Sequence, residues 1–426
     1  MDPLPEAPAA ASPVPFRDAL RFWARLGCIS FGGPAAQIAT MHEELVVRRR
    51  WLPEARFDHA LNFCMLLPGP EAQQLATYSG WLLHGARGGL AAGILFVLPA
   101  AVLLFALSWI YAVWGRLPAV EGVLWGAKAV VVALLVEAVL RLGKRALKRP
   151  VHAVLALAAV AALASGVAFP WLVVGGAVAG LLLPPAPATA PVPVVAAPTR
   201  GRFARTLRVL AIGLALWALP LLVLTAIGEP VRLAQQQYLF FSGAALVTFG
   251  GAYAVLAYVL QAAVETLHWI TPGQAIDGLA LAETTPGPLI MVLQFVGFAT
   301  GWNHPGTCTP IAAATLGAAV TTWATFLPSM LFVFLGAPWV ERLRGYAKAQ
   351  HALAGVTAAV LGVVAHLAFT FGKVVLLPVD AAGAMHLDVP ALLLAGVAYA
   401  ALASRRVGVV LTVVAGGALG AGRALL

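Results

Sequence analysis

Long apolar runs constrain this chain more than any other feature. Runs that approach or exceed the ~20 residues a helix needs to cross a bilayer recur at 90–113, 119–140, 151–184, 209–227, 310–335, 352–371, and at 389–403 followed by 407–422. Only 10% of the residues are charged, against roughly 25% in soluble domains. A soluble enzyme with a large core has no need of so many such runs. We therefore predict an all-α polytopic membrane protein with about 12–13 hydrophobic segments.

The chain also repeats itself. "SFGG" at 30–33 returns as "TFGG" at 248–251, an offset of 218 residues. The same offset places Trp51 on Trp269, and Pro68-Gly69-Pro70 on Pro286-Gly287-Pro288. After 11 inserted residues near 303–310 the register continues at an offset of 229, which matches Gly126, Gly143 and Lys144 to Gly355, Gly372 and Lys373. Several motifs in a fixed order predict two homologous halves.

The repeat divides the chain into five parts. Residues 1–15 read as a disordered tail, 16–184 as the first repeat, 185–204 as a Pro/Ala-rich linker, 205–228 as an extra connecting helix, and 229–426 as the second repeat. If each repeat crosses the bilayer an even number of times, the single extra helix inverts the second repeat. An inverted repeat is typical of secondary transporters.

The two Pro-Gly-Pro motifs stand inside apolar sequence and predict broken helices, because proline lacks an N–H and disfavours helix in the preceding residue. A helix that begins just after such a break presents free N–H groups and a positive dipole end, which favour an anion. We therefore predict a substrate-binding site at these breaks. Its candidate residues are Gly32, Gly33, Pro68, Gly69, Pro70, Lys128, Gly250, Gly251, Pro286, Gly287 and Pro288. The alternatives are ordinary turns at the prolines and simple close packing at the FGG glycines.

Ionisable residues inside apolar runs are the remaining candidates. Lys128 is a candidate cation for an oxyanion, or else a partner of Glu121 on the same helix face. Glu71, Glu137 and His366 are candidate proton carriers, since a desolvated carboxyl or imidazole can exchange a proton near neutral pH. Alternatively, Glu71 only caps its helix and Glu137 only pairs with Arg141.

Other classes of function find little support. The nine histidines show no HExxH spacing and no GxSxG occurs, which argues against an intramembrane enzyme. Three scattered cysteines predict neither a disulfide framework nor a metal site. Basic clusters such as 48–50 and 141–150 are expected in cytoplasmic loops beside anionic lipid rather than on nucleic acid. We predict no catalytic residue, metal or cofactor.

The motifs together resemble a known family. "SFGGPAAQIATMHEELV", "NFCMLLPGPEAQQLATYSGW" and "GAKAVVVALL" in the first half, with "LVTFGGAYAVL", "LALAETTPGPL" and "GVTAAVLGVVAHL" in the second, resemble the chromate ion transporter family in its long, two-domain form. The resemblance implies a multi-pass transporter of the inner, or plasma, membrane that exports chromate, is driven by the proton motive force and confers chromate resistance.

Chromate is a tetrahedral dianion much like sulfate, and it suits helix N-termini with nearby cations. Uptake of sulfate or another oxyanion remains the alternative. The residues leave the direction, the coupling ion and homo-oligomerisation open.

Overall fold

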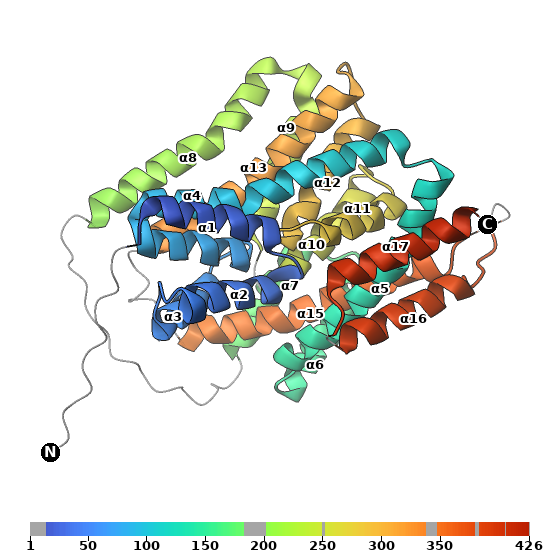
Figure 1. The fold of residues 1–426 in the computed structure, drawn as a ribbon, viewed down its shortest axis with the longest axis horizontal. Helices are drawn as coiled ribbons and strands as arrows, with labels where there is room; N and C mark the ends of the chain where they lie inside the picture. Colours follow the sequence, from blue (N-terminus) through green and yellow to red (C-terminus); the bar gives the residue numbers. More distant parts are fainter. Residues whose placement is uncertain are drawn as a thin grey trace.

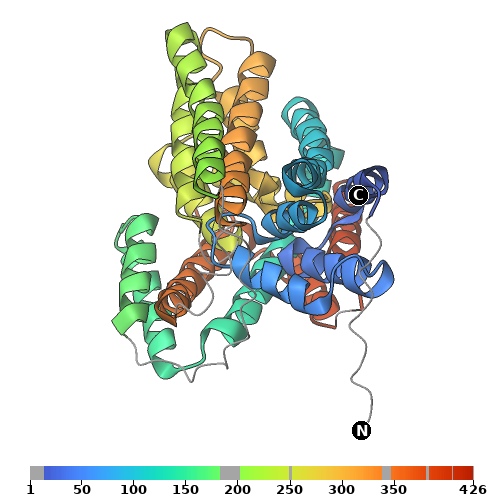
Figure 2. The same ribbon diagram turned by 90° about the vertical axis from the view of Figure 1, so that its left-hand side faces the viewer.

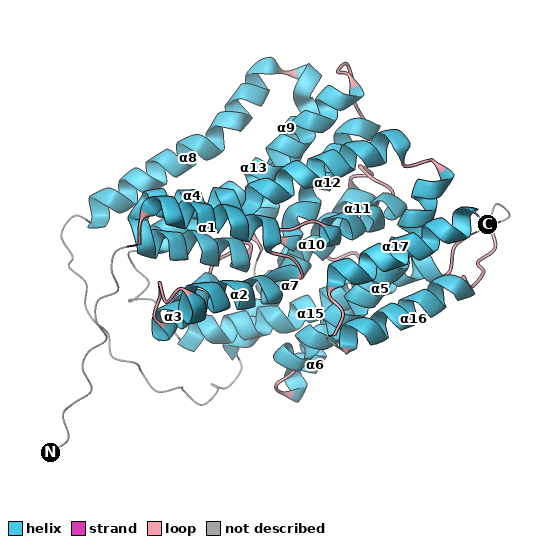
Figure 3. Ribbon diagram, viewed as in Figure 1, coloured by secondary structure: helices cyan, strands magenta, loops and turns pink. Residues whose placement is uncertain are grey.

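The computed structural model describes residues 14–182, 202–248, 252–337, 347–379, 383–404 and 406–425, and helices dominate it (Figures 1 and 3). Within this part, five helices are long and apolar enough to cross a membrane: Glu71–Trp114, Pro118–Ala146, Phe203–Ile227, Pro310–Gly336 and His351–Leu376. Six shorter apolar helices accompany them. The prediction of an all-α polytopic membrane protein is confirmed.

The elements follow the two halves. The first half contains α1 (Phe16–Ile29), α2 (Gly33–His42) with the π-helix η1 (Glu43–Arg48), α3 (Glu54–Cys64), α4 (Glu71–Trp114), α5 (Pro118–Ala146), α6 (Pro150–Ala164) and α7 (Phe169–Leu182). After α8 (Arg202–Ile227), the second half contains η2 (Glu229–Val231), α9 (Arg232–Leu246), α10 (Ala252–Gln261) with η3 (Ala262–Thr266), α11 (Pro272–Thr284), η4 (Leu289–Met291), α12 (Val292–Asn303), α13 (Pro310–Gly336), α15 (Ala347–Leu376), α16 (Val389–Ala403) and α17 (Val409–Leu425). Most of the predicted tail and linker lies outside the described residues.

Local sequence sets many of the helix starts. Proline occupies the first position of α5, α6, α11 and α13, where its missing N–H has no helical partner to lose. Thr271 and Gln274 form a capping box at α11, which satisfies two of the unpaired N–H groups there. α8 lies along the outer edge in Figure 1, and only 11% of its most apolar window is buried. Such an apolar and exposed helix requires lipid around it.

Backbone details repeat at the offset read from the sequence. α2 and α10 both end in a π-helical turn, η1 and η3. The N–H of Trp51 donates to the carbonyl oxygen of Leu45 at 2.8 Å, and the N–H of Trp269 donates to that of Ala263 at 2.8 Å. Arg50 and His268, also 218 residues apart, both have positive φ, at 52° and 50°. The two halves therefore share one fold.

The halves are inverted relative to each other. α13 and the second part of α4 are repeat mates, and both carry an internal proline. They pack antiparallel. A Cβ on Gly89 would lie 2.8 Å from the ring of Phe334, while one on Gly93, one turn later on α4, would lie 2.7 Å from Met330, one turn earlier on α13. Equivalent helices that run in opposite directions are the mark of an inverted repeat.

Each half also packs one long helix against the other half. α5 lies against α16 and α17, and α15 lies against α6 and α7 (Figures 1 and 2). The repeat mates Gly126 and Gly355 make these contacts possible. A Cβ on Gly126 would lie 1.9 Å from the carbonyl oxygen of Gly416, and one on Gly355 would lie 2.1 Å from that of Gly176. Small residues permit this close approach of membrane helices.

The chain reverses direction at both Pro-Gly-Pro motifs. The side chains of Gln274, at the start of α11, and Asn303, at the end of α12, are hydrogen-bonded at 3.2 Å. If α11 and α12 formed one straight helix, these two residues would lie more than ~30 Å apart. In the first half, Phe63 of α3 contacts Tyr78 of α4 with ring centroids 5.1 Å apart. The helices are interrupted as predicted, and each interruption is the tip of a helical hairpin.

A second reversal lies inside α4 and was not predicted. His84 and Gly85 leave the helical region, with φ of −138° and 62°. The backbones of Gly80 and Gly88 then come together, since a Cβ on Gly80 would lie 2.4 Å from the carbonyl oxygen of Gly88. Residues 71–83 therefore fold back on the helix that begins near residue 86.

Candidate functional site

The two Pro-Gly-Pro tips cross into the opposite halves. The N–H of Gly69 donates to the carbonyl oxygen of Thr248 at 2.9 Å, and the N–H of Gly287 donates to that of Ser30 at 2.7 Å. Ser30 and Thr248 are the repeat mates that open the two FGG motifs. Each proline-flanked tip is thus bonded to the helix break of the other half. The glycines allow this geometry because both have positive φ, 133° and 102°.

Gln37 of α2 fixes the second of these crossings, in which Gly287 bonds Ser30. Its side chain is fully buried, and its Nε2 donates to the carbonyl oxygens of Ser30 and Gly287. Gly32 precedes α2 and Gly33 begins it, with φ of 86° and 75°, which explains two glycines in succession. Their role here is a turn rather than close helix packing. Gly250 and Gly251 lie outside the described residues.

The first tip is also held from α13. Ser329 Oγ donates to Gln73 Oε1 at 2.8 Å, and Gln74 Nε2 donates to the carbonyl oxygen of Pro68 at 2.8 Å. Both glutamines are fully buried. Their amides thus serve the packing of the tip, with Ser329 joining it to the second half.

A cavity of about 220 Å³, which we call the arginine cavity, lies beside these breaks. Its wall includes Gly33 at the start of α2, Glu71 at the start of α4, Arg141 and Arg145 of α5, Tyr253 of α10, and Thr357 of α15. Neither α2 nor α4 has a side-chain cap, since their N-caps are Gly32 and Pro70. Two helix starts and two guanidinium groups therefore border one space, an arrangement suited to an anion.

Carboxylates share this cavity. Glu137 forms an ion pair with Arg141 one turn away, as one of the two sequence interpretations expected. Glu71 is the first residue of α4 and lines the cavity. Two of the three proton-carrier candidates therefore lie beside the arginines. His366, the third, lines a separate cavity of about 140 Å³ with Glu265 and Thr370.

Lys128 lies elsewhere, in a cavity of about 400 Å³ that we call the lysine cavity. Its Nζ is 3.1 Å from Asp277 Oδ1 of α11, and the hydroxyl of Tyr111 donates to Asp277 Oδ2 at 3.0 Å. Glu121 lines the same cavity, but the expectation that it is the ion-pair partner of Lys128 is wrong. The partner is Asp277 because the crossing of the halves brings α11 against α5.

Several residues of these cavities and their surroundings were not predicted from the sequence, namely Arg145, Tyr253, Asp277 and Glu283. Asp277 and Glu283 stand as isolated acids in the apolar run of α11, which was an available signal. Arg145 and Tyr253 carried no such signal, because only the packing of α5 against the two breaks brings them together.

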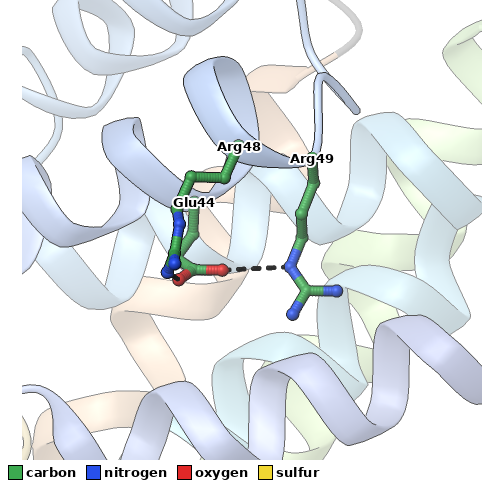
Figure 4. A network of polar contacts seen from close by, with 3 residues as sticks. All are labelled: Glu44, Arg48 and Arg49. Atoms are coloured by element: carbon green, nitrogen blue, oxygen red, sulfur yellow. Dashed lines mark hydrogen bonds and ion pairs between the residues drawn. The ribbon is translucent and has the colours of Figure 1, made fainter.

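Basic residues, some of them outside these cavities, also gather at helix ends. Glu44 of η1 accepts from Arg48 at 2.7 Å and from Arg49 at 3.1 Å (Figure 4). Burial raises the pKa of Glu44, but the two arginines outweigh this effect and hold the pKa below its usual value. The end of α5 is likewise basic, with Lys144 and Arg145 in its last turn.

Comparison with known proteins gives a consistent result. The chain is 35% identical over 366 residues to a "Chromate transport protein" from Pseudomonas aeruginosa, covering 84% of this chain and 81% of the relative. It is 30% identical over 364 residues to a "Chromate transport protein" from Cupriavidus metallidurans, covering 84% and 82%. A "Probable chromate transport protein" from Synechococcus elongatus is 28% identical over 358 residues, covering 83% and 84%. No solved structure matches the chain.

The family model described as "Chromate transporter" matches residues 17–181 and 235–421. Its two regions coincide with the two halves seen in the structure, and the relatives are transport proteins rather than enzymes. The chain therefore belongs to the chromate transporter family.

Proposed function

We propose that this protein is a secondary transporter that exports chromate across the inner membrane, is driven by the proton motive force and confers chromate resistance. The relatives named above are chromate transport proteins, and the arginine cavity offers the chemistry to bind such an oxyanion. The observation that carries the proposal is the pair Arg141 and Arg145 facing two uncapped helix starts.

Binding in this cavity follows from charge and hydrogen bonding. A tetrahedral dianion presents four oxygens that accept hydrogen bonds, and guanidinium groups donate to such oxygens in parallel pairs. The N–H groups at the starts of α2 and α4 add donors and a positive dipole end. In the proposal, the tips Pro68-Gly69-Pro70 and Pro286-Gly287-Pro288, with Gly32 and Gly33, hold these starts in place.

The position of the cavities supports alternating access. The arginine cavity lies near the basic end of α5, and the lysine cavity lies where α4 ends and α5 begins, lined by Tyr111 and Arg116. Basic loops favour the cytoplasmic side, so we assign the arginine cavity to that side and export begins there. In this proposal the inverted halves open the site to one side of the membrane and then to the other, around the two Pro-Gly-Pro tips that cross between them. Lys128 is then the cation that the oxyanion meets on its way out.

Coupling to protons requires a group that gains and loses a proton as the oxyanion moves. Glu71 and Glu137 line the arginine cavity and remain candidates from the sequence, together with His366. A carboxylate beside a dianion repels it, and protonation removes that repulsion. The binding of the proton and of the oxyanion are therefore linked in this cavity.

Inverted membrane vesicles test the proposal, because their interior corresponds to the outside of the cell. Vesicles that contain the protein should accumulate radiolabelled chromate when a proton motive force is imposed with the vesicle interior positive and acidic. Sulfate, molybdate and phosphate are added as competitors. Uptake at the same rate with and without the proton motive force would rule out coupling of transport to protons. Uptake of sulfate in place of chromate would change the substrate. Uptake only into right-side-out vesicles would reverse the direction.

A further inference from the structure

Glu283 is a buried acid next to the second Pro-Gly-Pro tip. It occupies the last turn of α11, and its residue is only 5% exposed. Its hydrogen-bond partner is the hydroxyl of Tyr253, which lies 3.5 Å from Oε1. Among the described residues, no cation forms an ion pair with it within 4.0 Å. The equivalent residue in the first half is Met65, so the acid belongs to one half only.

The surroundings of Glu283 disfavour its ionised form more than those of the neighbouring acids. Glu137 has the guanidinium of Arg141. Glu71 is at a helix start, where the dipole stabilises a negative charge. Glu283 is at a helix end, where the dipole is negative, and a buried carboxylate without a cation is costly. Of the three acids, Glu283 is therefore the one whose negative charge is least compensated by its surroundings.

Glu283 nevertheless communicates with the arginine cavity. Tyr253 lines that cavity, while its hydroxyl donates to the Glu283 carboxylate. The charged groups whose field reaches Glu283 are Glu137 and Arg141 of α5, and both also line the cavity. A dianion bound to Arg141 would therefore face Glu283 across the Tyr253 side chain.

We propose that Glu283 is the proton-binding group of the transport cycle, protonated while an oxyanion occupies the arginine cavity and able to ionise once the oxyanion has left. This inference rests on the proposed function of that cavity. The proton is taken from and returned to water, and no other bond changes. Since linkage is reciprocal, oxyanion binding takes up a proton, and protonation tightens oxyanion binding. A dianion and one proton that leave the cell together carry a net charge of −1, so the membrane potential, which is the electrical part of the proton motive force, drives their export.

The experiment measures chromate binding to the purified full-length protein by calorimetry in detergent, over a series of buffers from mildly acidic to mildly alkaline. Glu283→Gln imitates the neutral acid in size and hydrogen bonding. Glu137→Gln is the competing candidate. Glu229→Gln, an exposed acid of η2 that lines none of the three cavities, is the control. The protonation of chromate itself is common to all four proteins and cancels in the differences.

In the wild type and in Glu229→Gln, the chromate dissociation constant should rise by up to about tenfold per pH unit once the pH exceeds the value at which Glu283 releases its proton. This rise comes in addition to the pH dependence of chromate itself. Glu283→Gln should bind chromate at every pH and lose this additional dependence. If Glu283→Gln kept the wild-type pH dependence, or if Glu137→Gln alone removed it, the inference would be overturned. If the wild type bound no chromate, the proposed function of the cavity would fall as well. Gel filtration of each variant confirms that it is folded.

Discussion

Gly69 and Thr248, which belong to opposite halves of the chain, are joined by a backbone hydrogen bond of 2.9 Å. Their repeat mates Gly287 and Ser30 are joined in the same way. The tip of each helical hairpin therefore completes the helix break of the other half. When one half moves, its tip moves with it and pulls on the helix break of the other half. The two breaks are therefore coupled during any change in the side of the membrane to which the site opens.

Substitution of either tip glycine should damage the protein. A Cβ on Gly69 would lie 2.6 Å from Ser329 Oγ, and one on Gly287 would lie 2.5 Å from the Cβ of Ala100. Both glycines also have positive φ, which costs an alanine about 1–2 kcal/mol. Gly69→Ala and Gly287→Ala should each lower the melting temperature and chromate transport at equal membrane abundance.

Gly243→Ala in α9 is the matched control, since a Cβ on Gly243 would have no atom within 4 Å. It should behave as the wild type. Normal transport in Gly69→Ala and Gly287→Ala would mean that the crossed tips do not constrain the cycle.

The tip prolines should matter to transport as well as the glycines. Pro68 and Pro286 interrupt the hairpins beside the two cross-bonded glycines. A Pro68→Ala/Pro286→Ala variant regains the N–H groups and the helical preference that proline removes. Cells that express this variant should accumulate more radiolabelled chromate than cells that express the wild type at equal abundance. Equal accumulation of chromate in the two cell lines would show that the helix breaks take no part in transport.

The contact of α5 with α17 should be sensitive to a single methyl group. Gly126→Ala would place its Cβ 1.9 Å from a backbone oxygen, and overpacking of this kind costs about 1–3 kcal/mol. Thermal unfolding in detergent should show a lower melting temperature. Gly175→Ala on α7 is the control, because a Cβ there would have no atom within 4 Å, and it should leave the melting temperature unchanged or slightly raised. An equal drop in melting temperature in the two variants would point to a general effect of replacing glycine with alanine.

Lys128 and Asp277 should show strong coupling. Lys128→Gln leaves the carboxylate of Asp277, whose side chain is only 5% exposed, without its cation, which should cost about 1–3 kcal/mol of stability. The double variant Lys128→Gln/Asp277→Asn should recover most of this loss because no unpaired charge remains. Losses that simply add in the double variant would mean that the two residues act independently.

Glu44 gives a prediction about pH. Its pKa is lower in the folded protein than its usual value, so the folded state is stabilised at pH values above the unfolded pKa of about 4.3. This contribution is lost as the pH falls through the folded value. Glu44→Gln should therefore lower the melting temperature slightly at neutral pH, by the equivalent of about 1 kcal/mol or less. The difference from the wild type should shrink in acid, and a constant difference at every pH would assign the effect to packing.

The sequence predicts the parts of this structure that depend on local pattern. The repeat at Trp51 and Trp269, the interruptions at the prolines, and the Glu137–Arg141 pair one helical turn apart all follow from spacing. The reversal at His84 does not follow from spacing. The polar and glycine residues at 84–89 mark a gap before the apolar run at 90–113, but hydropathy records no chain direction. The partners of Lys128 and Gly69 also escape prediction, since Asp277 and Thr248 meet them only through the crossing of the halves.

Transport by the purified protein tests the central claim most directly. Proteoliposomes that contain the wild type should take up radiolabelled chromate, and those that contain Arg56→Gln, an exposed arginine outside the cavity, should match them. The variant Arg141→Gln/Arg145→Gln should lose most of this uptake, because both guanidinium groups of the cavity are removed. Uptake by the double variant at the wild-type rate would contradict the assignment of the arginine cavity as the oxyanion site.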